Sequence, residues 1–576
     1  MTFDTLRART PIGLTLLVAA AACSSSSDNG TGNPPTCTGS TITVAVNQVA
    51  TVPQSEAPCV QFAADGSTYM IVPQFASGNG PQSQIGYQMG TFATGSANIV
   101  RYVPGAPGVP QWSLHPKPSG NREKFDFMLR DKERALSLTA RPQPQAQLPP
   151  GVARGGGPPS VGDTGFFWVC GDLNCAGFKR DTSIVKYAGS KIDIFVSINS
   201  PAAGLSAGDI NALGATFDTD LYPIDTMTFG APSDIDGNHR VFVLLTPKVN
   251  AMTTPSECAS QGFIAGFFFG NDLIPANPGS NAAEIFYSIV PDPTGTFSCA
   301  HSVASVKDLV LGTFIHEFQH MISWNQHVIV RGGQSEETWL NEGMSHIAEE
   351  MGSRFYEQKW PCPPCTGGRS TAGQLFPDSS EGFIGGDLLN SYSYLSSSGA
   401  SSVTLFASSG SLEERGAVWL FLRWLGDLKD STVYFKLDQT ALTGVQNIET
   451  QSGDNFTHLF GDWTMAIYTD SLPGLPRNTA PARDRYVSRN LRQLYNRLFV
   501  TGAVPFPFPV ANITMPIGGR QSSSMIVGTM EYWKLTMPNS GSSQQLIFTS
   551  SSNGTFAGSD SAQVSIFHCP SAAACP

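Results

Sequence analysis

The segment at residues 305–325 constrains the fold most strongly, because its apolar side chains recur with the period of an α-helix. Ser305 and Asp308 are spaced as a capping box at the start of such a helix. The segment therefore predicts an amphipathic helix that begins near Ser305. Its apolar positions are Val306, Leu309, Val310, Phe314, Ile315, Phe318, Met321 and Ile322.

Two histidines lie on this predicted helix. His316 and His320 are four residues apart, so their side chains stand one turn apart on one face, with Cβ atoms ~5–6 Å apart. At that separation the two imidazoles can share one metal ion. Glu317 follows His316 by about 100° around the helix, which places its carboxylate beside a metal-bound water rather than on the metal. This is the position expected of a general base.

A catalytic zinc with two histidine ligands needs a third protein ligand, and an open position for water or substrate. The metzincin pattern does not supply it, because Ser323 and Gln326 stand where its glycine and histidine belong and His327 is one position late. Glu342 lies in a second helical stretch at residues 336–356. A loop and a returning antiparallel helix would bring Glu342 back to the two histidines.

The run Asn341-Glu342-Gly343 resembles the gluzincins, thermolysin-like metallopeptidases in which HExxH is followed by a helix that contains Asn-Glu. The combination of HEFQHMI with WLNEGMSHIAE is similar to the hyicolysin-type neutral metallopeptidases, over residues 163–500. The resemblance implies a zinc ion, peptide or protein substrates, and Glu342 as the third zinc ligand.

Carried over residue by residue, the resemblance makes His316, His320 and Glu342 the zinc ligands and Glu317 the catalytic carboxylate. The expected function is that of an exported zinc metalloendopeptidase, in which a metal-activated water attacks the peptide bond and Glu317 acts as general base.

The sequence departs from the gluzincin pattern at one position. Thermolysin-like enzymes place an Asp four residues after the ligand Glu to orient a ligand histidine, and here that position is His346. Glu349, on the same helical face, is the candidate substitute. Tyr392 and Tyr394 lie downstream, where such enzymes often keep a tyrosine that stabilises the oxyanion, although packing in a loop explains them equally well.

The chain as a whole predicts an α+β fold, with a zincin-like metallopeptidase domain at residues 163–500 flanked by small β-domains. The flanking units are a β-rich domain at 37–119 and a C-terminal β-sandwich at 501–576, and a charged helix with a Pro/Gly-rich linker occupies 120–162. Within the large domain we expect strands at 192–198, 240–246 and 284–290, a helix from a Ser206–Asp209 capping box to Phe217, and an apolar core helix at 411–430.

The first residues indicate export. Two arginines precede an apolar stretch at residues 12–22 that is too short to span a bilayer and ends in small residues before Cys23. This pattern predicts a lipoprotein signal peptide at 1–22, a lipid anchor on Cys23 and a flexible tether at 23–36. A plain secretory signal is the alternative, so the location is the cell envelope or the medium.

The cysteines other than Cys23 number ten and fall in close pairs, which predicts disulfides in an oxidising compartment. The Cys362-Pro-Pro-Cys365 unit could also be a redox or metal motif, although no second CxxC accompanies it. The pairing of neighbours gives Cys37–Cys59, Cys170–Cys175, Cys258–Cys299, Cys362–Cys365 and Cys569–Cys575.

Charge, motifs and the number of available metal ligands decide which other classes of function stay open. A net charge of −11 and the absence of a phosphate-binding glycine motif argue against a nucleic-acid partner. A surface adhesion or binding lipoprotein with a structural metal stays open, and it would need a fourth ligand such as His346 or His327. An inactive protease-like domain also stays open.

Residues 233–238 (SDIDGN) resemble part of a calcium loop. A calcium cage would also need a later bidentate Glu, and none can be placed from the sequence. An ordinary turn is therefore the favoured interpretation.

Overall fold

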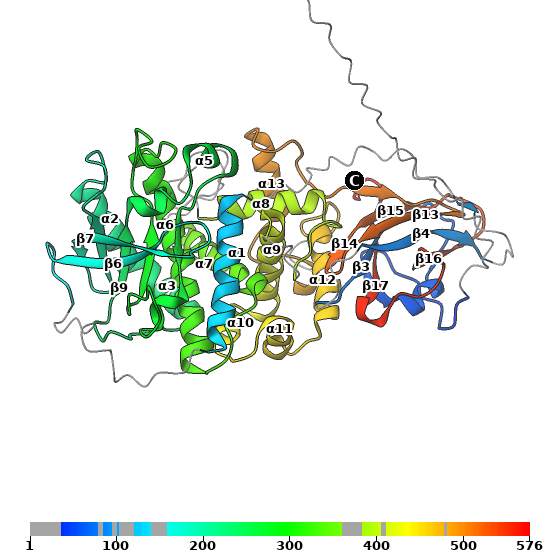
Figure 1. Ribbon diagram of the computed structural model, residues 1–576. Helices are drawn as coiled ribbons and strands as arrows, with labels where there is room; N and C mark the ends of the chain where they lie inside the picture. The colour runs from blue at the N-terminus through cyan, green and yellow to red at the C-terminus, as the bar shows by residue number, and fades with distance from the viewer. Residues whose placement is uncertain are drawn as a thin grey trace, which may run out of the picture.

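The structure is a computed structural model that describes residues 36–78, 84–94, 101–102, 120–139, 158–359, 383–404, 410–476 and 481–575. A mixed β-sheet lies at one end of the molecule, helices fill the middle and a β-sandwich lies at the other end (Figure 1). The signal peptide, nearly all of the tether, the Pro/Gly-rich part of the linker and the Cys362–Cys365 pair lie outside the described residues.

The mixed sheet has the strand order β10-β11-β9-β8-β7-β6. Strands β8, β9 and β11 run parallel, and they are almost wholly buried, as expected for parallel strands with both faces covered. The strands expected at 192–198, 240–246 and 284–290 are confirmed as β8, β9 and β11. The bounds are β6 Thr164–Cys170, β7 Phe178–Ala188, β8 Ile192–Ser197, β9 Val241–Leu245, β10 Gly266–Phe268 and β11 Ile285–Ser288.

The central helices include the expected apolar helix, α9, most of whose residues are buried. The capping box of Ser206 and Asp209 is present at the start of α2. The bounds are α1 Asn121–Ser137, α2 Ala207–Thr216, α3 Tyr222–Thr228, α4 Pro247–Asn250, α5 Pro255–Gln261, α6 Val303–Trp324, α7 Thr338–Lys359, α8 Gly385–Ser396, α9 Leu412–Lys429, α10 Thr432–Asp438, α11 Gly444–Ser452, α12 Phe456–Thr469 and α13 Leu491–Val500.

Helix α6 begins three residues earlier than the sequence predicts. The N-cap is Ser302, whose hydroxyl accepts a hydrogen bond from the backbone N–H of Ser305 at 3.0 Å. Ser305 is therefore inside the helix, and the expected cap at Ser305 is wrong. A serine can cap a helix without a carboxylate three residues later, which is why the Ser305–Asp308 pattern was misleading.

The β-sandwich combines both ends of the chain. One sheet has the order β1-β17-β3-β15-β12, with β14 paired to β3, and the other has the order β2-β16-β4-β13-β5. Strand β4, from the N-terminal segment, pairs with β13 and β16 from the C-terminal segment. The bounds are β1 Val49–Pro53, β2 Gln61–Phe62, β3 Thr68–Phe75, β4 Ile85–Ala93, β5 Arg101–Tyr102, β12 Asn512–Thr514, β13 Gly519–Met525, β14 Thr529–Met530, β15 Tyr532–Thr536, β16 Gln544–Ser550 and β17 Ala562–His568.

The expectation of two separate β-domains at 37–119 and 501–576 is therefore wrong. The two sheets enclose one apolar core, to which strands of both segments contribute. Strand β3 lies between β17 and β15, so the N-terminal segment alone would leave its edges unpaired.

The sandwich is joined to the helical layer through α12. The side-chain amide of Gln74 in β3 donates to the hydroxyl of Thr464 in α12 at 2.9 Å, and the hydroxyl of Tyr532 donates to the Thr464 carbonyl at 2.8 Å. These buried contacts connect the two parts of the molecule.

Four of the expected disulfides are present among the described residues, namely Cys37–Cys59, Cys170–Cys175, Cys258–Cys299 and Cys569–Cys575. In the same described part of the chain, no helix has the length and apolar character needed to cross a membrane.

Candidate metal centre

Helices α6 and α7 carry the residues singled out in the sequence. Every residue at positions 313–324 of α6 is buried, so this half of the helix is enclosed by the sheet on one side and by α7 on another. The chain reverses direction after α6 through Gly332, whose φ is 64°. Glycine adopts this left-handed conformation without a steric penalty, and the reversal returns α7 alongside α6.

His316, His320 and Glu342 are brought together by this reversal. One nitrogen of each histidine and one carboxylate oxygen of Glu342 lie within 4.8 Å of one another. Nε2 of His316 is 3.8 Å from Oε2 of Glu342, and Nε2 of His320 is 3.6 Å from Oε1. All three side chains are at most 3% exposed.

This arrangement fits a zinc ion. Ligands about 2.0–2.2 Å from a tetrahedral zinc lie roughly 3.3–3.5 Å from each other, close to the separations found here. Oε1 of Glu342 is buried and has no hydrogen-bond partner. A buried carboxylate oxygen without a partner destabilises the folded state. A metal ion held by these three side chains would satisfy this oxygen.

Both histidines are oriented by a partner on α7. Nδ1 of His316 is 2.7 Å from Oε1 of Glu349, and Nδ1 of His320 is 2.5 Å from Oδ1 of Asn341. An acceptor at Nδ1 fixes the proton there and leaves Nε2 free to bind a metal. Glu349 thus occupies the orienting role for which it was the candidate, and Asn341 was not foreseen in this role.

The protonation states suit metal binding. Burial lowers the pKa of His316 to about 4 and that of His320 well below its ordinary value, so both imidazoles are neutral at pH 7. Burial alone raises the pKa of Glu342, but Arg415 and then His316 outweigh it, and the pKa is lowered to about 2. Neutral imidazoles and an ionised carboxylate are the forms that ligate a metal.

Glu317 lies next to this group without joining it. Its Oε2 accepts a hydrogen bond from the backbone N–H of Phe268 in β10 at 2.8 Å, and the side chain is 5% exposed. Burial, followed by the nearby Asp126 carboxylate, raises the pKa of Glu317 to about 8. A bound cation would oppose this rise, because an adjacent positive charge favours the carboxylate.

Arg415 was missed in the sequence, although it is a buried charged residue near the start of α9. Its Nη1 donates to Oε2 of Glu342 at 2.6 Å and lies 3.3 Å from Oδ2 of Asp126. The guanidinium is 2% exposed. It holds Oε2 of Glu342, the oxygen near His316, and leaves Oε1 near His320 without a hydrogen bond.

Helix α1 was expected only as a charged helix beside a linker, yet it packs along the edge strand β10. The rings of Phe125 and Phe267 are 5.1 Å apart, and Nη2 of Arg130 donates to the Phe268 carbonyl at 2.8 Å. Oε1 of Glu133 accepts from the N–H of Gly270 at 2.7 Å. Helix α1 therefore lies on the side of the site where Phe268 meets Glu317.

The other residues considered from the sequence lie elsewhere. The hydroxyl of Tyr392 bonds to the backbone of Phe506, and that of Tyr394 contacts the sulfur of Met530, so both tyrosines pack α8 and neither serves the site. His327 is fully buried between Glu336 and Asp438.

His346 does not join the three side chains either. Its Nδ1 is 2.9 Å from Asp387 and 3.4 Å from Glu349. Burial alone lowers the pKa of His346, but these two carboxylates outweigh it and raise the pKa to about 10. His346 is close to His316 and Glu349, and His327 lies between Glu336 and Asp438, so neither is grouped with His316, His320 and Glu342 as the fourth ligand that a structural metal would require.

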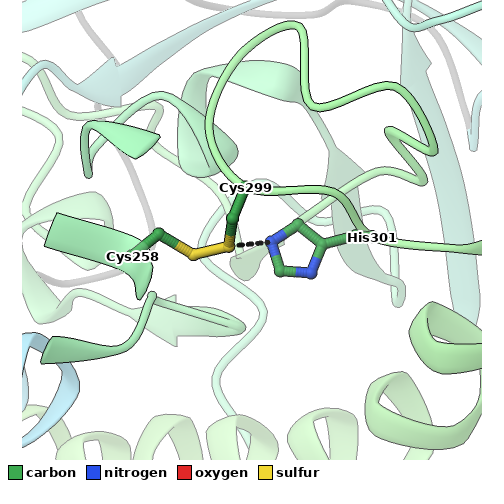
Figure 2. Close-up of side chains that lie close together, drawn as sticks. All are labelled: Cys258, Cys299 and His301. Carbon is green, nitrogen blue, oxygen red and sulfur yellow. Dashed lines mark hydrogen bonds between the residues drawn. A yellow bond between two sulfur atoms is a disulfide. The ribbon is translucent and has the colours of Figure 1, made fainter. Parts of the chain in front are cut away.

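Cys258, Cys299 and His301 form a second group of ligand-type side chains, but the two sulfurs are bonded to each other. Figure 2 shows the disulfide with the ring of His301 beside it, and the contact between that ring and Sγ of Cys299 is 3.6 Å. Metals bind the thiolate form of cysteine, so this group is a structural crosslink.

Comparison with known proteins finds a similarity to a metalloprotease. No protein-family model matches the chain. A stretch of 174 residues is 29% identical to the neutral metalloprotease ShpI of Staphylococcus hyicus, and it covers 30% of this chain and 36% of ShpI. The chain thus spans about a third of the length of this curated relative. The similarity supports a metalloprotease function and, with it, a metal cofactor.

Proposed function

We propose that this protein is a zinc-dependent metalloendopeptidase that is exported from the cell. The observation that carries the proposal is the convergence of His316, His320 and Glu342, with a buried oxygen of Glu342 that lies near His320 and has no hydrogen-bond partner. Glu317 lies beside them and is anchored by Phe268 rather than by the ligand set. Two histidines and one carboxylate suit zinc, and they leave one position open for substrate.

The chemistry divides between the metal and the chain. When bound, zinc supplies Lewis-acid catalysis at neutral pH. Glu317 accepts the proton of the attacking water and then donates it to the leaving amine. The Phe268 N–H holds Oε2 of Glu317, which leaves Oε1 for the proton. Glu349 and Asn341 keep both imidazoles in the tautomer that presents Nε2.

Substrate access requires α1 to move. The side chains of the three ligands and of Glu317 are at most 5% exposed, and a peptide cannot reach them while α1 occupies the edge of β10. Residues 140–157, which connect α1 to the mixed sheet, are rich in Pro and Gly. We infer that the described arrangement is a closed state, and that displacement of α1 opens the site to protein substrates.

The proposal is tested by zinc content and by casein hydrolysis of the purified full-length chain. One zinc per chain, and hydrolysis that 1,10-phenanthroline abolishes and added zinc restores, are expected. His316→Ala and Glu342→Ala should each lose the zinc and the activity, because each removes one of three ligands. Full zinc occupancy in both variants would contradict the ligand assignment. If the wild type held zinc but cleaved no peptide even after α1 had been released, a binding lipoprotein with a structural metal would be the better interpretation.

A further inference from the structure

Three acidic side chains away from the metal centre lie close together at the starts of the parallel strands β9 and β11. Asp234 and Asp236 belong to the loop that precedes β9, and Glu284 immediately precedes β11. One oxygen of each carboxylate lies within 4.8 Å of the others. The sequence indicated only the two aspartates of the loop as candidate calcium ligands. Glu284 is distant along the chain, and the pairing of β11 with β9 brings it to the loop.

Glu284 provides an independent sign of a missing ligand. The side chain is 1% exposed, and its Oε1 accepts from the hydroxyl of Ser233 at 2.5 Å and from the N–H of Ile235 at 2.9 Å. These contacts aim the carboxylate into the loop. Its Oε2 is buried and has no hydrogen-bond partner. Burial raises the pKa of Glu284 to about 7, so the ionised form of this carboxyl, next to two further carboxylates, is unfavourable on its own. A cation between the three carboxylates would stabilise the ionised form and satisfy the unpaired oxygen.

We propose that Asp234, Asp236 and Glu284 bind a calcium ion. Calcium holds six to eight oxygens at about 2.3–2.6 Å, so oxygens up to about 5 Å apart can share one ion. Zinc prefers nitrogen and sulfur ligands, and magnesium requires a nearly ideal octahedron with several waters. An all-oxygen set on an irregular loop therefore favours calcium, with water and backbone carbonyls completing the coordination.

The loop is already folded around these positions. The N–H of His239 donates to Oδ1 of Asp234 at 2.9 Å, and the side-chain amide of Asn238 donates to Oδ2 of Asp236 at 2.7 Å. A carboxylate oxygen has two lone pairs, so each of these oxygens can accept a hydrogen bond and ligate a cation. Gly237, with φ at 71°, forms the tight turn between them.

The proposed ion would stabilise the strands that support the metal centre. Glu284 lies two positions before Phe286, and Phe286 is paired with Phe268 across β11 and β10. The N–H of Phe268 is the donor that holds Glu317. Calcium would therefore fix the loop before β9 to the start of β11, and so stabilise the sheet on which Glu317 is positioned.

The test is calcium binding to the full-length, zinc-loaded protein, measured by isothermal titration calorimetry with calcium chloride and by thermal unfolding. One calcium per chain should bind at this site, and the melting temperature should rise by about 2–3 °C at a calcium concentration one hundred times the dissociation constant. Glu284→Gln should weaken calcium binding at least tenfold. Without calcium the same variant should melt at the wild-type temperature or above it, because it removes a buried, incompletely paired carboxylate.

Asp236→Asn gives a second variant should Glu284→Gln fail to fold, because Asp236 lies in a half-exposed loop. Asp225→Asn is the matched control. It also replaces a buried acidic side chain without hydrogen-bond partners by its amide, but outside this group, so it should leave the calcium-induced shift unchanged. The absence of calcium binding in the wild type, or equal affinity in wild type, Glu284→Gln and Asp236→Asn, would overturn the proposal.

Discussion

Replacement of Glu349 tests whether the carboxylate opposite His316 supports the metal. Oε1 of Glu349 lies 2.7 Å from Nδ1 of His316, which makes this a strong, charge-assisted hydrogen bond. Loss of such a partner typically lowers metal affinity by about 10- to 100-fold, which corresponds to about 1.4–2.7 kcal/mol. Glu349→Ala should lie near the upper end of that range. Glu349→Gln should lie near the lower end, because its amide oxygen can still accept the Nδ1 proton while the charge is lost.

The assay is competition for zinc with a chromogenic chelator, with circular dichroism to confirm that each variant is folded. Glu357→Gln serves as the control on the same helix. Glu357 bonds to Arg489 and Ser353 rather than to a histidine, so its replacement should not change zinc affinity. If Glu349→Ala bound zinc within about twofold of the wild type, the orienting role of Glu349 would be refuted.

Three further predictions concern stability, access and location. Burial, and then Asp438, raise the pKa of Asp225 well above its ordinary value, so the folded state binds this proton more tightly than the unfolded state and stability is lost as the pH rises above about 4. Asp225→Asn should therefore have a higher melting temperature than the wild type at pH 8. Calorimetry should show that this difference vanishes near pH 4. Phe125→Ala removes a buried ring that holds α1 against β10, at a cost of about 3–5 kcal/mol, and should raise the rate of casein hydrolysis, whereas an unchanged rate in a folded variant would argue against occlusion by α1. Cys23→Ser should abolish labelling with a radioactive fatty acid, and continued labelling would show that Cys23 is not the acylated residue.

The local parts of the site were predictable from the sequence. A pair of histidines four residues apart on one amphipathic helix determines their common face, and this geometry is present in α6. Glu342 and Glu349 could be placed because they share the next long helix, α7, at helical spacing. Periodicity within each helix gave the face on which these residues lie, whereas the contact between α6 and α7 rested on the expected antiparallel return and on the resemblance to the gluzincins.

Contacts between segments far apart in the sequence were not predictable. Arg415 reaches Glu342 from α9, and Arg130 and Asp126 reach the site from a helix that reads only as charged. The merging of the terminal segments into one β-sandwich depends on strand pairing across more than four hundred residues. Nothing in the local pattern of either strand specifies such a partner. Glu284 was overlooked as a partner of the acidic loop for the same reason.

The most direct test of the central claim is hydrolysis by Glu317→Gln measured together with its zinc content. Glu317 lies outside the ligand set, and glutamine keeps its size and can still accept the hydrogen bond from Phe268. Zinc should therefore remain at one per chain, while peptide hydrolysis falls by about a hundred- to ten-thousand-fold, the usual contribution of a general base. Wild-type hydrolysis by zinc-loaded Glu317→Gln would contradict the account, because the proton would then have another acceptor.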